Sequence, residues 1–109
     1  MFAMWVTVQV RPGAREEFLT AITEAATAAV EHEPGCLAFD VLELDREDGR
    51  YAFYELYRDE AAWRDEHRAS AHFAAWRAVA DRVLVPDAKT NQPAEVVAAP
   101  RVLTAGDAR

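Results

Sequence analysis

The residues of this sequence best suited to proton transfer are two histidines. His67 and His72 lie five residues apart in the segment DEHRASAHFAAW (65–76), on either side of Ser70. An imidazole has an ordinary pKa of about 6.5, so it can accept or release a proton near neutral pH. Either ring, if it faces an apolar pocket, is therefore a candidate general base.

The same histidines have two other possible roles, metal binding and structural support. Metal ligands on one helix usually lie three or four residues apart, whereas a spacing of five turns side chains about 140° from each other. Cys36 is the single cysteine and is distant in sequence, and a transition-metal site needs three or four ligands. We therefore expect no metal. A structural role stays open, with His67 ending a short helix and His72 in the first turn of the next.

Glu55 is a further candidate for the site because its strand face is aromatic. On that face it alternates with Tyr51, Phe53 and Tyr57. A half-buried carboxylate needs a partner, since an unpaired buried charge is strongly unfavourable. His67 or His72 would be that partner, and its tautomer would then be fixed and its basicity raised. The alternative is a salt bridge from Glu55 to Arg58 or Arg64 at the edge of the sheet.

Large aromatic side chains are dense for a small domain. They include Trp5, Phe39, Phe53, Tyr54, Tyr57, Trp63, Phe73 and Trp76. Most are expected in the core, but together they would line a flat apolar slot for an aromatic or polyketide-like ligand if sheet and helix do not close fully. The expected substrate contacts are Trp5, Phe39, Tyr54, Phe73 and Trp76. The sequence has no glycine-rich phosphate loop, nucleophile elbow or Rossmann fingerprint, so flavin and nicotinamide cofactors are not supported.

The first half of the chain predicts a strand, a helix and two further strands. Residues 3–10 are rich in β-formers, and a helix follows in which apolar residues recur at steps of three and four. This helix stops at Glu33-Pro34-Gly35-Cys36, because proline disfavours helix in the residue before it and glycine permits positive φ. Residues 37–43 and 51–57 are strands, joined by a polar turn that contains Asp48-Gly49.

The second half of the chain predicts two helices and a last strand. Asp59 and Ser70 are suitable N-caps for a short helix and a longer one. The expected segments are a short helix at 59–67, a helix at 70–85, a loop at 86–93 and a strand within 95–103.

The order β-α-β-β-α-β predicts an α+β domain with the ferredoxin-like arrangement, an antiparallel four-stranded sheet with both helices on one face. We expect residues 1–103 to form a single domain and residues 104–109 a flexible tail. The strands carry large apolar side chains on both faces, so the face without helices also needs a cover. A second copy of the chain would supply it, and we expect a homodimer with two sheets packed face to face.

Charge and composition exclude several classes of partner. The net charge is −7 and there is no basic patch, so we expect no binding to nucleic acid and no attraction to an anionic membrane. The apolar opening MFAMWVTVQV is too short to span a bilayer and lacks the flanks of a signal peptide. A single cysteine cannot form an internal disulfide, which fits a reducing, cytoplasmic setting.

Four motifs, spread over about residues 4 to 85, resemble the antibiotic biosynthesis monooxygenase family of the dimeric α+β barrel superfamily. They are Arg11-Pro12-Gly13, Glu33-Pro34-Gly35-Cys36 with Phe39, Tyr54-Glu55-Leu56-Tyr57 with Asp59, and His67-x-x-Ser70-x-His72-Phe73. The resemblance implies an oxygenase without a cofactor that oxidises quinols or polycyclic phenols with dioxygen. In such an enzyme His67 or His72 would be the base and Glu55 the orienting group, while Trp5, Phe73 and Trp76 would hold the substrate.

Two departures from the family pattern bear on this expectation. The first strand has no asparagine, and Arg77 stands close to where haem-degrading members carry a haem-ligating histidine, so haem is disfavoured. Ala71 occupies the place where many relatives have proline, so the local loop is expected to differ.

Two alternatives to the oxygenase remain. The segment 50–60 also resembles family members that isomerise a phosphorylated sugar derivative, and Arg64, Arg68 and Arg77 would then bind the phosphate. The net charge and the aromatic density favour the apolar ligand over this one. The other alternative is a dimeric binding module without catalytic activity, in which the histidines are structural.

Overall fold

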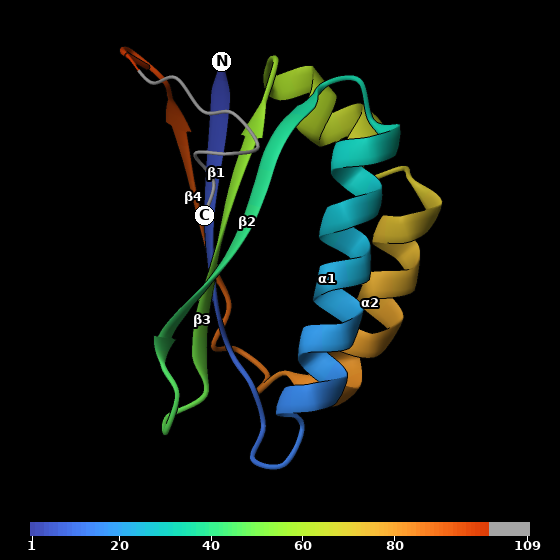
Figure 1. Ribbon diagram of the computed structural model, residues 1–109, viewed down its shortest axis with the longest axis vertical. Helices are drawn as coiled ribbons and strands as arrows, with labels where there is room; N and C mark the ends of the chain where they lie inside the picture. Colours follow the sequence, from blue (N-terminus) through green and yellow to red (C-terminus); the bar gives the residue numbers. More distant parts are fainter. Residues whose placement is uncertain (101–109) are drawn as a thin grey trace, which may run out of the picture.

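The computed structural model describes residues 1–100 as a four-stranded antiparallel sheet with helices on one face (Figure 1). The elements are β1 (Phe2–Gln9), α1 (Arg15–His32), β2 (Cys36–Asp45), β3 (Arg50–Tyr57), a short π-helix η1 (Ala62–His67), α2 (Ala71–Val83) and β4 (Thr90–Glu95). The strand order is β2-β3-β1-β4. The predicted α+β ferredoxin-like fold is therefore confirmed.

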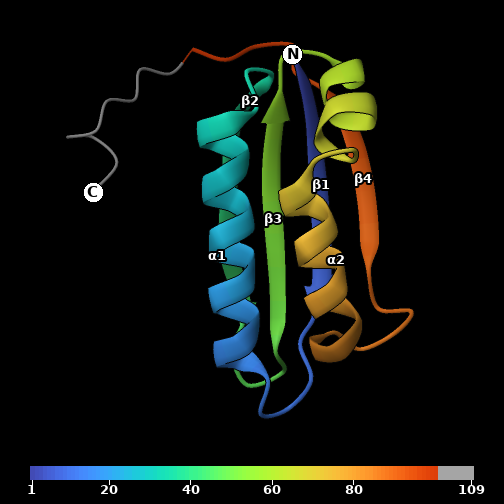
Figure 2. The same cartoon turned by 90° about the vertical axis from the view of Figure 1, so that its right-hand side faces the viewer.

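Helices α1 and α2 lie side by side over the sheet, with α1 nearer β2 and α2 nearer β1 (Figure 2). The apolar stripe of α1 is buried as its periodicity predicts, with Phe18, Ile22 and Ala29 fully inside. Phe18 packs against Tyr51 of β3 and Trp76 of α2, with ring centroids 4.8 and 5.9 Å apart. This aromatic contact joins both helices to the middle of the sheet.

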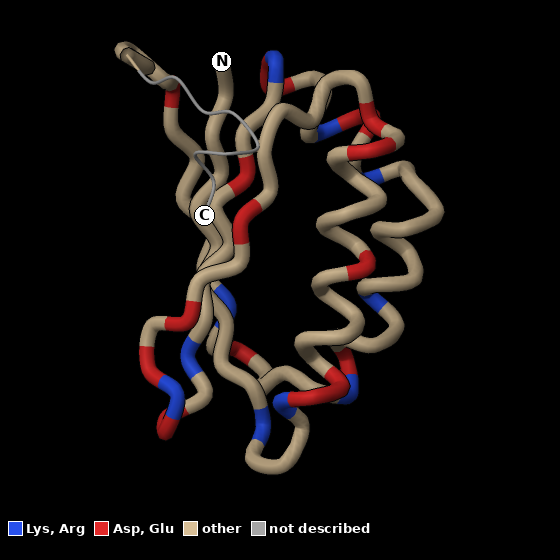
Figure 3. The backbone as a smooth tube through the Cα atoms, in the orientation of Figure 1, with Lys and Arg blue, Asp and Glu red and all other residues tan. Residues whose placement is uncertain are grey.

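The turn between β2 and β3 forms at the predicted Asp48-Gly49, and charged residues gather there (Figure 3). Gly49 has φ +70°, and an added Cβ would lie 2.6 Å from the carbonyl oxygen of Val10. Only glycine fits this position because the conformation and the close backbone both exclude a side chain. The hairpin is thereby held against the end of β1.

The last strand lies earlier than predicted. β4 is Thr90–Glu95 and pairs with β1, so most of it falls in the segment 86–93 that was expected to be a loop. Its side chains are all exposed, and an exposed edge strand need not alternate apolar with polar residues, which is why the pattern missed it. Pro93 is tolerated because an edge strand has one side without partners. The expected tail, 104–109, lies outside the described residues.

Trp5 and Tyr54 lie on the sheet face away from the helices. They are cross-strand partners in the pairing of β1 with β3, and they alternate with residues that point to the helices, such as Met4 and Glu55. Trp5 remains 37% exposed, and Leu42 of β2 is also exposed on this face. The sheet therefore has an apolar outer face, which we call the outer sheet face. Within residues 1–100, no helix has both the length and the apolar character needed to cross a bilayer.

Candidate active site

A cavity of about 340 Å³ lies between the sheet and α2. Its inner wall is aromatic, formed by Phe39, Phe53, Trp63, Phe73 and Trp76. Two buried polar side chains, those of Glu55 and His67, also line it. Ligand-binding cavities are commonly of this size and of this mainly apolar character.

The predicted substrate contacts divide between the two faces of the sheet. Phe39, Phe73 and Trp76 line the cavity, whereas Trp5 and Tyr54 do not. The structure does not bring this pair to the cavity, because β1 and β3 are apolar on both faces and nothing in the sequence indicates which face borders it.

His67 ends η1 and is only 5% exposed. Its Nδ1 lies 2.9 Å from Oε2 of Glu33, and its Nε2 lies 4.0 Å from Oε1 of Glu55. Since a carboxylate only accepts hydrogen bonds, the neutral imidazole donates its proton from Nδ1 to Glu33. This tautomer leaves the lone pair of Nε2 directed to Glu55 and the cavity.

His72 also approaches Glu33, through Nε2 and the same carboxylate oxygen that His67 contacts. Its side chain is 17% exposed and does not line the cavity. The two histidines therefore converge on Glu33, and the expected orienting group, Glu55, is not the one that holds them. Glu55 approaches one of the two rings, that of His67, over 4.0 Å, so the sequence missed the role of Glu33 and not the proximity of Glu55 to an imidazole.

Glu33 was identified in the sequence only as part of a helix stop. It is the C-cap residue of α1 and is 8% exposed. The C-terminus of a helix carries partial negative charge, so a buried carboxylate is unfavourable there without compensation. The sequence shows only an acidic residue at a helix end, and its burial, which requires a partner, is known from the structure.

Gly35 allows the turn after α1 to approach η1 closely. An added Cβ at Gly35 would lie 2.6 Å from Cβ of Ala62, the first residue of η1. The carbonyl oxygen of Gly35 also accepts a hydrogen bond of 2.8 Å from the backbone N–H of Arg58. The absence of a side chain at this position brings Glu33 within reach of His67.

Ser70 links the two helices that carry the histidines. Its hydroxyl donates to the carbonyl oxygen of His67 over 2.6 Å and accepts from the backbone N–H of Phe73 over 3.2 Å. Ser70 is thus the N-cap of α2, as predicted, and Asp59 accepts from the N–H of Ala62 before η1. These caps set the relative positions of the two rings.

Glu55 is 5% exposed, and burial is the main reason that its pKa is raised to about 7. The hydroxyl of Tyr57, which donates to Oε1 of Glu55 over 2.6 Å, and the charge of Lys89 both act in the opposite direction. The alternative salt bridge from Glu55 to Arg58 or Arg64 is not formed. Arg58 instead contacts Asp59 and Glu66, and Arg64 contacts Glu60 and Asp65.

Burial also lowers the pKa of His67 below its ordinary value, although Glu33 acts against this shift through its hydrogen bond and its charge. The ring is therefore mostly neutral near pH 7 and free to accept a proton at Nε2.

Exposed cationic side chains surround the mouth of the cavity. They are Arg11, Arg68, Arg77 and Lys89. Partial loss of solvent around its ammonium group, and secondly the charge of Arg77, lower the pKa of Lys89. Within residues 1–100, none of the four takes part in an ion pair. Asp81 and Asp87 also border the cavity, so the four cationic side chains outnumber the exposed acidic ones there although the chain as a whole is acidic.

The chain is similar in sequence to known proteins. The sequence profile described as antibiotic biosynthesis monooxygenase matches residues 1–79. "Putative monooxygenase Rv0793" of Mycobacterium tuberculosis is 35% identical over 74 residues, which are 68% of this chain and 70% of that protein. A Synechocystis protein is 32% identical over 66 residues, and the match spans 61% of this chain but only 44% of that relative's length.

Solved structures show the same fold. The structure of Rv0793 has a TM-score of 0.77 with 25% identity, and the match covers 92% of this chain and 98% of the other. A structure from Nitrosomonas europaea has a TM-score of 0.81 with 21% identity and covers 90% and 100%. From its sequence profile and from these relatives, the chain belongs to the antibiotic biosynthesis monooxygenase family.

Proposed function

We propose that this protein is a cofactor-independent monooxygenase that oxidises a quinol or polycyclic phenol with dioxygen, and that His67 is its general base. The observation that carries the proposal is the orientation of His67. Its Nδ1 is held by Glu33, and its Nε2 faces an apolar cavity next to Glu55. A buried carboxylate–imidazole pair of this kind stabilises the imidazolium that forms when a substrate is deprotonated.

The first step is removal of the phenolic proton by Nε2 of His67. The gap of 4.0 Å between Nε2 and Oε1 of Glu55 is wide enough for one hydroxyl oxygen to contact both groups. Exclusion of water by the aromatic wall keeps the electrostatic interaction between imidazolium and phenolate strong. Glu55 is therefore proposed as a substrate contact, and Glu33 takes the orienting role.

The phenolate then reacts with dioxygen without help from a metal or flavin. It transfers one electron to dioxygen, and the resulting radical pair combines to form a carbon–oxygen bond and a hydroperoxide, which takes its proton from the imidazolium. Loss of the carbon-bound proton and cleavage of the O–O bond release water and leave a quinone. Phe39, Phe73 and Trp76 would stack on the flat rings of the substrate.

The cationic mouth supports a second candidate, the isomerisation of a small phosphorylated hydroxyketone. Arg68 and Arg77 were predicted as phosphate ligands from the sequence, and both border the mouth, while Arg64 does not. In this reaction His67 would remove a proton next to the carbonyl group. Solvent deuterium would enter the substrate without oxygen uptake, which distinguishes this activity from the first.

The homodimer expected from the sequence is also part of the proposal. The outer sheet face carries Trp5, Leu42 and Tyr54 without a covering layer in one chain, and a second copy would bury it.

Oxygen consumption by chelator-treated protein, supplied with an anthrol or hydroquinone, tests the oxygenase. We expect His67→Ala to lower the rate by about 10²-fold or more, as loss of a general base usually does. His32→Ala is the matched control, because His32 is exposed at the end of α1. Turnover of His67→Ala at the wild-type rate would exclude His67 as the base.

A further inference from the structure

The contact of Glu33, His67 and His72 brings together three metal-ligating groups from separate elements. One ligand atom from each residue lies within 4.8 Å of the other two. Glu33 caps the end of α1, His67 ends η1 and His72 lies in the first turn of α2. The five-residue spacing of the histidines is no obstacle here, because a break at Ser70 places them on different helices.

We propose that these three side chains bind one divalent transition-metal ion, with Zn²⁺ as the best match. Two imidazoles and one carboxylate are a usual ligand set for zinc, with a fourth position left for water. Zinc–ligand bonds of about 2.0–2.1 Å place neighbouring ligand atoms about 3.3 Å apart in a tetrahedral site. The separation of 2.9 Å between Nδ1 of His67 and Oε2 of Glu33 is slightly shorter than this, and the other separations in the cluster lie within 4.8 Å, so the three side chains must adjust when the ion binds.

The local charges favour a cation at this position. Within residues 1–100 no lysine or arginine forms an ion pair with the buried carboxylate of Glu33, whose contacts are the two imidazoles. The negative end of the α1 dipole lies at the same residue. A divalent ion would neutralise both, and the partly exposed ring of His72 opens a route from solvent that does not pass through the cavity.

Metal binding and the proposed base function exclude each other at His67. A metal on Nδ1 leaves the proton on Nε2, so the ring that faces the cavity becomes a donor and cannot accept a proton. Zn²⁺ would therefore inhibit the oxygenase without entering its cavity. This consequence rests on the proposed function, whereas the metal site itself does not.

Titration of chelator-treated protein with Zn²⁺, in competition with a chromophoric chelator, tests the site. We expect one equivalent of Zn²⁺ per chain. Glu33→Gln and His72→Ala should each weaken binding by about 10²-fold, since each removes one of only three protein ligands. His32→Ala is the control and should bind as the wild type does.

Other results would exclude the proposed metal site or show that it exists without the proposed oxygenase activity. Absence of stoichiometric binding, or wild-type binding by folded Glu33→Gln, would place any bound ion elsewhere. Bound Zn²⁺ should also raise the melting temperature of the wild type but not of His72→Ala, because a ligand of the folded state stabilises it by mass action. Zn²⁺ binding without oxygen uptake by the zinc-free protein would retain the metal site and reject the oxygenase.

Discussion

At the scale of single residues, the environment of Glu55 is the most unusual in the site. Its carboxyl group faces Tyr57 on its own strand, His67 of η1 and the cavity, and it also feels the charges of Lys89 and Glu33. Burial is stronger than the favourable contacts and raises its pKa from 4.5 to about 7. A group whose pKa rises on folding binds its proton more tightly in the folded state, so folding is favoured while the group is protonated.

We predict that the stability of the wild type falls, relative to Glu55→Gln, as the pH rises from about 4.5 to about 7. Below this window the carboxyl group is protonated in both the folded and the unfolded chain, whereas above it the folded chain must bury a charge. The shift corresponds to about 3 kcal/mol as an upper value. Urea unfolding at several pH values measures the difference, and parallel curves for the two proteins would contradict the raised pKa.

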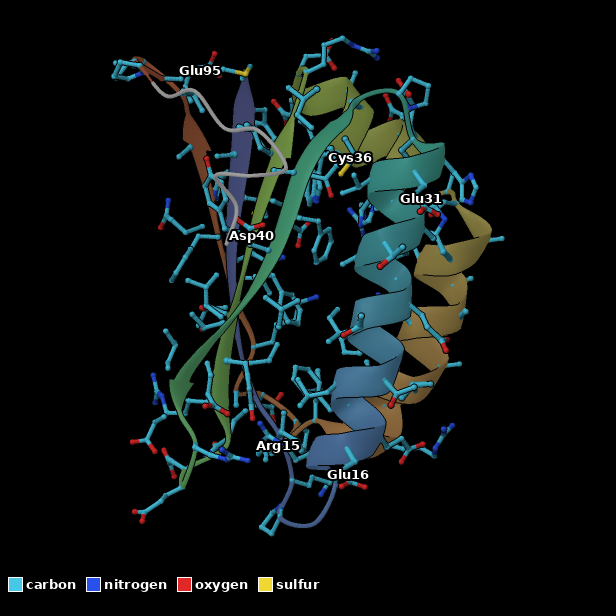
Figure 4. The ribbon with its side chains drawn as sticks, viewed as in Figure 1. Arg15, Glu16, Glu31, Cys36, Asp40 and Glu95 are labelled. Atoms are coloured by element: carbon cyan, nitrogen blue, oxygen red, sulfur yellow. The ribbon has the colours of Figure 1, made fainter. Side chains whose placement is uncertain are left out.

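At the scale of elements, close approach of the turn after α1 to η1 builds the site. Cys36 begins β2 directly after this turn and lies at the end of the sheet nearest η1, while Arg15 and Glu16 lie at the opposite end (Figure 4). The pair Gly35 and Ala62 sets the separation of the two segments. Glu33 therefore reaches His67 only because the neighbouring residues are small.

Gly35→Ala should destabilise the fold by about 1–3 kcal/mol, the usual cost of an extra methyl group in a tightly packed contact. The added carbon would push η1 away and lengthen the contact between Glu33 and His67. Removal of the opposing methyl group in Gly35→Ala/Ala62→Gly should recover part of the loss, apart from the cost of a glycine in a helix. A double-mutant cycle by thermal unfolding measures this coupling. Strictly additive changes in the free energy of unfolding would show that the two positions have no steric contact that affects stability.

At the scale of the whole molecule, two surfaces differ in character from the rest of the chain, which carries a net negative charge. One is the positive mouth of the cavity, and the other is the apolar outer sheet face. The outer sheet face lies on the side of the sheet opposite the helices, so a partner that covers it would leave the mouth open to substrate.

Trp5→Asp should convert the proposed homodimer to a monomer, because it places a charge at the centre of an apolar interface. Light scattering after size-exclusion chromatography measures the mass. Val30→Asp is the matched control, since Val30 is exposed on α1, far from the outer sheet face, and should not change the mass. A Trp5→Asp protein with the mass of a dimer would exclude this face as the interface.

Local rules predicted much of the fold because they act between near neighbours in the chain. The stripe on α1, the hairpin at Gly49 and the caps at Asp59 and Ser70 each depend on residues a few positions apart, and each is found as predicted. The position of β4 was not predicted correctly. Its exposed residues form a strand because they pair with β1, and they carry no apolar pattern of their own.

The sequence by itself determined which residues could do chemistry, and it placed His67, Glu55, Phe39, Phe73 and Trp76 among them. Only the tertiary structure decided that Glu33, 34 and 39 positions before the two histidines, is their common partner, and that Trp5 and Tyr54 face away from the cavity. The physical reason is that side-chain type and spacing limit what a residue can do. The contact of distant segments, by contrast, depends on how the packed layers leave room for close approach.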